Sequence, residues 1–188
     1  MCGGCSVTRL AAFPLLLLLA GLLLAGCSDP VVTPADEAKE APALERAGLD
    51  GEPLSLAQYE GRVVLLNFWA TWCPYCQKEI PHLIELQREL GGDGLQVVGA
   101  ALNWQFDSQE PGDPTVFREK VGAFSMENGL NYPLPLVASD MKGVLERFGN
   151  PIGTIPYSVL IDRQGRIRQT FQGNPGYDKL HRAVKRLL

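Results

Sequence analysis

The sequence predicts an α/β fold in which a central mixed β-sheet is flanked by helices. Two apolar runs, at residues 63–69 and 95–101, enclose a helical pattern at 74–90, and this order makes a βαβ unit with parallel strands. A hairpin pattern at 157–171 and a final helix make a ββα half. The residues between the two halves, 103–150, are expected to be an insertion.

The βαβ half has the clearest pattern. Residues 63–69, VVLLNFW, are an almost unbroken apolar run, which is typical of a strand buried on both faces. Residues 74–90 carry apolar side chains three and four positions apart, so that one face of the helix is apolar. The glycines in residues 91–94 are expected to end this helix before the second strand, LQVVGAA.

The insertion has weaker patterns. Residues 103–114 are expected to form a loop, because NWQFDSQEPGDP is polar and rich in turn residues. Helices are expected at 115–128 and 140–148. In the ββα half that follows, strands at 157–161 and 167–171 are joined by Asp-Arg-Gln-Gly, a favourable turn sequence.

The first 26 residues are expected to be a lipoprotein signal peptide. An apolar run at residues 10–25 follows Arg9 and is shorter than the roughly 20 residues that a spanning helix requires. It ends in Leu24-Ala25-Gly26-Cys27, which resembles the bacterial lipobox, and this resemblance implies a diacylglyceryl group on Cys27. The alternative is a signal anchor that stays uncleaved. Both interpretations place the rest of the chain outside the cytoplasm, anchored to the inner or outer membrane and facing the periplasm.

A flexible tether is expected at 27–46, because residues 28–46 contain three prolines and alternating charges without an apolar period. A coil of this length would place the domain on the order of 25 Å from the membrane. The folded domain is expected at 47–188. It would begin with a short hairpin that turns at Asp50-Gly51.

Charge and cysteine content limit the function. Loss of the signal peptide removes one basic residue, so the mature chain carries 16 basic and 21 acidic residues, a net charge of −5. There is no Lys/Arg run, and nucleic acid is therefore not expected as a partner. After lipidation of Cys27, only Cys73 and Cys76 remain. A disulfide between two such close cysteines closes almost no loop and stabilises the fold little, which favours a chemical role for the pair. The protein is expected to be a monomer.

Cys73 and Cys76 are expected to be a redox pair at the start of the helix. The N-terminus of a helix stabilises a thiolate, so Cys73 is the expected nucleophile and Cys76, one turn further on, the resolving thiol. The alternative is half of a zinc site, but the mature chain offers only His82 and His181 as further histidine ligands. No metal and no cofactor are expected.

Four features together resemble the thioredoxin superfamily, and within it the TlpA-like group of periplasmic, membrane-anchored thiol-disulfide oxidoreductases. They are NFWATWCPYC, Pro81 inside the helix, the Ile155-Pro156 step, and the VLIDRQG hairpin. The resemblance covers about residues 47–188 and implies a thioredoxin-like fold. It also implies that Pro156 is a cis-proline facing the cysteines, and that Ile155 offers its backbone to an extended substrate. The residues expected to bind substrate are Trp72, Pro74, Tyr75, Ile155 and Pro156.

Three positions refine this resemblance. Asn67 stands where thioredoxins have a buried aspartate, and Glu79 matches an acidic residue of the TlpA-like group. One hypothesis is that Glu79 takes the proton of Cys76 as a general base; the alternative is a solvated carboxylate beside Lys78. Tyr157 stands where reductases of cytochrome c maturation often have an acidic residue, which weakens a haem-pathway assignment.

The expected function is disulfide exchange with periplasmic proteins, as a reductant that a membrane electron donor supplies. The same chemistry as a dithiol oxidant is the alternative. A thiol peroxidase would need a threonine and an arginine around its cysteine, and Thr71 does not make that pattern. A copper-delivery module would use a wider cysteine spacing and a histidine. Resemblance to glutaredoxins is limited to Pro74-Tyr75.

Overall fold

The computed structural model describes residues 32–103 and 113–188. Its strands are β1 (Lys39–Glu40), β2 (Glu45–Ala47), β3 (Pro53–Ser55), β4 (Val63–Trp69), β5 (Leu95–Leu102), β6 (Leu136–Val137), β7 (Tyr157–Ile161) and β8 (Arg166–Gln172). Its helices are α1 (Pro74–Leu90), α2 (Pro114–Asn128), α3 (Met141–Arg147) and α4 (Tyr177–Lys185), with the 3₁₀ helix η1 (Leu56–Tyr59). The signal peptide, Cys27 and most of the expected loop at 103–114 lie outside the described residues.

The central sheet has the predicted mixed topology. Its six strands lie in the order β1-β8-β7-β4-β5-β6, with β4 parallel to β5 and antiparallel to β7. The bounds of β4 and α1 agree with the prediction, because a doubly buried strand and an amphipathic helix each leave a strong sequence pattern. The bounds of β7 also agree, and those of α2, α3, β5 and β8 differ from the predicted ranges by one residue at one or both ends.

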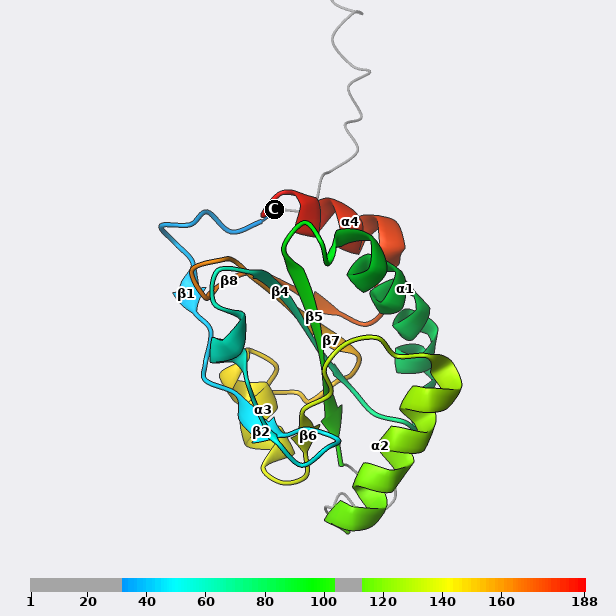
Figure 1. Cartoon of the computed structure of the whole chain (residues 1–188). Coiled ribbons are helices and arrows are strands. Elements are labelled where there is room, and N and C mark those ends of the chain that lie inside the picture. Colours follow the sequence, from blue (N-terminus) through cyan, green and yellow to red (C-terminus); the bar gives the residue numbers. More distant parts are fainter. Residues whose placement is uncertain (1–31, 104–112) are drawn as a thin grey trace, which may run out of the picture.

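Helices cover both faces of the sheet (Figure 1). Successive residues of β4 alternate between two cores: Val63, Leu65 and Trp69 contact the side of α1, α2 and α4, whereas Val64, Leu66 and Phe68 contact the side of α3. This alternation follows from the period of two of a β-strand. None of the helices in residues 32–103 and 113–188 is long and apolar enough to cross a bilayer.

The insertion adds a strand that the sequence pattern did not reveal. Strand β6 has two residues and follows Pro133 and Pro135, so it has neither the length nor the alternation of a recognisable strand. The segment nevertheless runs along β5: the amides of Gly99 and Ala101 donate to the carbonyls of Pro133 (2.9 Å) and Pro135 (3.0 Å). The insertion is therefore joined to the sheet edge next to the βαβ unit.

The expected flexible tether is wrong for the residues from Thr33 onward. Thr33 exchanges backbone and side-chain hydrogen bonds with Arg168, β1 pairs with the β8 edge, and Leu44 is buried in the core on the α3 side. The hairpin is β2–β3, and its first strand begins within the expected tether, at Glu45. The physical reason is that β8 would otherwise be an open sheet edge, and pairing with it requires backbone groups rather than an apolar period.

Candidate active site

The cysteine pair lies at the N-terminus of α1, just after the end of β4. Cys73 is the N-cap of α1, Pro74 occupies the first turn, and the amide of Cys76 donates to Sγ of Cys73 at 3.2 Å. The two cysteines are joined by a disulfide with their Cα atoms 5.3 Å apart. This placement directs the positive end of the helix dipole toward Cys73, as a reactive thiolate requires.

Two aromatic side chains stand at the surface beside the disulfide. Tyr75 is 67% exposed and Trp72 is 39% exposed, whereas both cysteines are buried except for a small part of Cys73. Nζ of Lys78 lies 5.5 Å from the centre of the Tyr75 ring. The exposed aromatic surface is therefore next to the less buried sulfur.

The loop before β7 approaches the same sulfur from the other half of the sequence. The Ile155-Pro156 bond is cis, as predicted, and the carbonyl oxygen of Ile155 lies 3.9 Å from Sγ of Cys73. Two buried side chains hold this loop: the hydroxyl of Tyr157 donates to the carbonyl of Phe148 (2.9 Å), and Nδ2 of Asn150 donates to the carbonyl of Thr154 (2.7 Å). Tyr157 thus contacts the loop that carries the cis-proline.

Glu79 is fully buried in the structure, so the alternative of a solvated carboxylate is wrong. Its Oε2 accepts a hydrogen bond from Nδ2 of Asn67 at 2.9 Å. Burial raises the pKa of Glu79 to about 7, although hydrogen bonds from Asn67 and Ser158 act in the opposite direction. The carboxyl therefore gains and loses its proton near neutral pH.

Two residues near Glu79 were missed by the sequence analysis. Ser158 accepts a hydrogen bond from Nδ2 of Asn67 at 2.9 Å, and it faces Asn67 across the β4–β7 pairing. A serine within the apolar strand YSVLI was the available signal. Tyr132, from the insertion, is buried against the same core and lies within range of the Glu79 charge. No local pattern marked Tyr132.

The two histidines lie in a different contact, between α1 and α4. Nε2 of His181 lies 3.1 Å from a carboxylate oxygen of Glu89, and the ring of His82 faces that of Tyr177. Within residues 32–103 and 113–188, no three His, Cys, Asp or Glu side chains are grouped so as to hold a metal ion.

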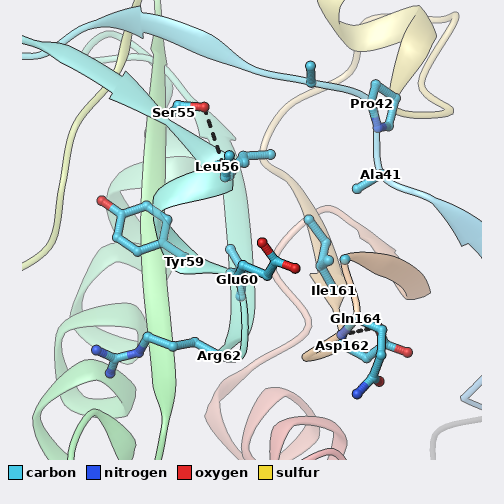
Figure 2. Close-up of a pocket in the computed structure, with 14 residues that line it drawn as sticks. Ala41, Pro42, Ser55, Leu56, Tyr59, Glu60, Arg62, Ile161, Asp162 and Gln164 are labelled. Carbon is cyan, nitrogen blue, oxygen red and sulfur yellow. Dashed lines mark hydrogen bonds between the residues drawn. The ribbon is translucent and has the colours of Figure 1, made fainter.

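A separate surface pocket of about 290 Å³ lies at the opposite end of the sheet (Figure 2). Its walls come from the N-terminal segment, η1 and the β7–β8 turn, and they include Tyr59, Arg62 and Asp162. Val64, which also lines it, is near the start of β4, whereas Cys73 follows the end of that strand. This pocket contains none of the predicted site residues.

Comparison with known proteins agrees with this arrangement. Residues 38–170 match the AhpC/TSA family. The chain is 30% identical to thiol-disulfide oxidoreductase ResA of Geobacillus thermodenitrificans over 133 residues, which covers 71% of this chain and 67% of the relative. It is 34% identical to thioredoxin-like protein YneN of Bacillus subtilis over 137 residues, 73% of this chain and 72% of that protein.

Solved structures show the same fold. A thiol:disulfide interchange protein of the thioredoxin family from Chlorobium tepidum superposes with a TM-score of 0.65 at 28% identity, covering 80% of this chain and 96% of that one. A secreted thiol-disulfide isomerase from Corynebacterium glutamicum reaches a TM-score of 0.71 at 23% identity, covering 84% and 90% of the two chains. The chain therefore belongs to the AhpC/TSA family of thioredoxin-like proteins, and it is a thiol-disulfide oxidoreductase.

Proposed function

We propose that this oxidoreductase reduces disulfides of periplasmic proteins through Cys73 and Cys76. The observation that supports this most directly is the position of Cys73, at the N-terminus of α1 and 3.9 Å from the carbonyl of the residue before the cis-proline. An extended substrate segment would bind along Ile155 and Pro156, between the exposed rings of Trp72 and Tyr75. Pro74 contributes by starting the helix directly after Cys73.

The reaction begins with the reduced dithiol. The thiolate of Cys73 attacks one sulfur of the substrate disulfide, forms a mixed disulfide and releases the other substrate sulfur as a thiolate. Cys76 then loses its proton and attacks Sγ of Cys73, which forms the Cys73–Cys76 disulfide and releases the second substrate thiol. Two electrons pass from the protein to the substrate, and a membrane electron donor restores the dithiol.

Glu79 is the base that we assign to the second step. Cys76 is buried and therefore holds its proton tightly, and Asn67 has no proton-accepting group of suitable basicity. Glu79 lies three residues further along α1, on a neighbouring position of the same helical face. A carboxyl whose pKa is about 7 is well suited to accept a proton at neutral pH.

The direction of electron flow is tested by a redox titration of the cysteine pair against glutathione and thioredoxin standards. A reduction potential near thioredoxin's roughly −270 mV supports the reductant, and a value near −120 mV supports the alternative, a dithiol oxidant. The readout is the fraction of free thiol at each buffer potential. A potential at the oxidising end would overturn the proposed direction and leave the exchange chemistry intact.

We also propose that a lipid on Cys27 anchors the domain to the membrane. Since Thr33 is bound to β8, five residues separate it from Cys27, and these six residue steps span about 20 Å at most when extended. Cys27→Ser should abolish incorporation of labelled fatty acid and release the protein from the membrane fraction. Unchanged labelling would remove this part of the proposal.

A further inference from the structure

The insertion delivers one aromatic residue to the buried side of the active site. The segment before β6 is fixed to β5 by the hydrogen bond from the amide of Gly99 to the carbonyl of Pro133. This bond places the neighbouring residue, Tyr132, against the sheet face that also carries α1. Tyr132 is 7% exposed, so most of its side chain is buried in the core.

Gly99 provides the space for this ring. A Cβ atom on Gly99 would lie 2.8 Å from Cε2 of Tyr132, which would displace the ring, and 3.1 Å from Nε1 of Trp69, which is a tight contact. Gly99 pairs with Asn67 in the parallel register of β4 and β5, and Asn67 holds Glu79. The ring of Tyr132 therefore lies one strand away from the amide that binds the Glu79 carboxyl.

The phenol and the carboxyl influence each other electrostatically. Burial raises the pKa of Tyr132, and the negative charge of Glu79 raises it further. Tyr132 is therefore a neutral hydrogen-bond donor throughout the pH range in which Glu79 titrates.

Few polar groups face Glu79. Asn67 comes from β4, Ser158 from β7, Cys76 from α1 itself, and Tyr132 from the insertion. His82, one turn further along α1, faces α4 instead. Of the two carboxyl oxygens, Oε2 accepts from Asn67, whereas Oε1 has no hydrogen-bond partner among the described residues.

The outer side of Tyr132 faces solvent. Together with Leu49, Leu130 and Leu134 it lines a surface hollow of about 510 Å³ between the β2–β3 turn and the insertion. The ring thus forms a wall between this hollow and the core that contains Glu79. Removal of the ring would give water a route toward the carboxyl.

We propose that Tyr132 is a positioning residue for Glu79: its ring separates the buried carboxyl from the surface hollow and keeps water from it. This inference rests on the proposed role of Glu79 as a base. It gives the insertion a part in catalysis, because Tyr132 would set the pH at which Glu79 accepts the proton of Cys76.

Two substitutions separate the hydroxyl from the ring. Tyr132→Phe keeps the wall and removes only the hydroxyl, so the pKa of Glu79 should stay at about 7. Tyr132→Ala opens the wall to water, so the pKa of Glu79 should fall toward its ordinary value. The carboxyl carbon of Glu79 is followed by NMR in the oxidised protein, where the cysteines do not titrate.

Tyr177→Phe is the matched control. The hydroxyl of Tyr177 donates to Glu89, an exposed carboxylate of the same helix, and its loss should leave the titration of Glu79 unchanged. If Tyr132→Ala also leaves that titration unchanged, the inference is overturned. A fall of the pKa in Tyr132→Phe as large as in Tyr132→Ala would overturn the role of the ring as the wall.

The pH profile of mixed-disulfide resolution distinguishes this inference from the proposed function. In Tyr132→Ala the profile should move to lower pH by the same amount as the carboxyl titration. If Glu79→Gln leaves the rate and the profile unchanged, the base role of Glu79 fails. The NMR titration still tests whether Tyr132 controls the protonation of that carboxyl.

Discussion

The two sides of the disulfide differ in exposure and chemistry. On the side of Cys73, the surroundings are an exposed aromatic surface, Trp72 and Tyr75, and the backbone of the cis-proline loop. On the side of Cys76, they are buried and polar: Asn67, Glu79 and the residues around them. The comparison indicates a division of labour in which the exposed side selects and orients the substrate, while the buried side controls when the second thiol reacts.

The largest expected effect comes from removing one of the two thiols, because each thiol carries out a different step of the exchange. Cys76→Ser should abolish turnover and accumulate mixed disulfides through Cys73, since no thiol remains to resolve them. Cys73→Ser should trap far fewer. We expect the Cys73 thiol to titrate below the free value of about 8.5, owing to the helix N-terminus. Non-reducing gels and thiol alkylation against pH provide the measurements, and equal trapping by both variants would contradict the assignment.

Glu79→Gln tests the buried side alone. The substitution keeps a similar shape and removes the base, so resolution of a mixed disulfide should slow by about 10²-fold, the lower end of the general-base range, while attack by Cys73 changes little. Glu85→Gln on an exposed position of the same helix is the matched control. Rapid-quench analysis of the two steps separates them. Equal slowing of both would show that the two sides are not independent.

The strongly patterned elements were predictable for a physical reason. A buried strand such as 63–69 and a helix such as 74–90 have a local pattern of apolar residues. The cysteine pair at the start of this helix is a recognisable sequence motif at a recognisable position. By contrast, β1 and β6 each consist of two residues held by backbone pairing, which leaves no side-chain period. Strands that are held only by backbone pairing with residues distant in the sequence therefore leave no local sequence pattern.

The polar residues around Glu79 show the same limit of local sequence patterns within the site. Asn67 and Glu79 were recognised through the resemblance to thioredoxins and the TlpA-like group, because they stand at fixed positions relative to the cysteines. Ser158 and Tyr132 are brought to them only by the β7 pairing and by the insertion, respectively. The burial of Glu79, which turns an ordinary carboxyl into one that titrates near neutrality, likewise depends on elements distant in the sequence.

The buried carboxyl should also make stability depend on pH. The pKa of Glu79 is about 7 in the folded protein against 4.5 in an unfolded chain, so the folded state binds more protons between these values. The free energy of unfolding therefore falls as pH rises from about 4.5 to 7, by at most about 3 kcal/mol from this group. Urea unfolding of the oxidised protein at pH 5 and pH 8 measures the fall. In Glu79→Gln the fall in the free energy of unfolding should be smaller by the contribution of Glu79. An equal fall in both proteins would show that ionisation of Glu79 does not destabilise the folded protein.

The smallest expected effect lies on the exposed side. Tyr75 is two-thirds exposed and contacts Lys78, so Tyr75→Ala removes part of the surface that we propose to bind substrate, without disturbing the core. A single aromatic contact at an exposed edge contributes about 1 kcal/mol, which corresponds to a severalfold rise in KM for a protein disulfide. Because the step that depends on Glu79 is untouched, kcat and its pH profile should stay at the wild-type values.

Met126→Ala, which truncates an exposed apolar residue of α2, controls for a general loss of surface hydrophobicity. Steady-state kinetics with a folded protein substrate and with a small disulfide complete the comparison: the small disulfide should show no change in KM. A fall in kcat, or a shift of its pH profile, would mean that the exposed and buried sides are coupled and that the division of labour does not hold.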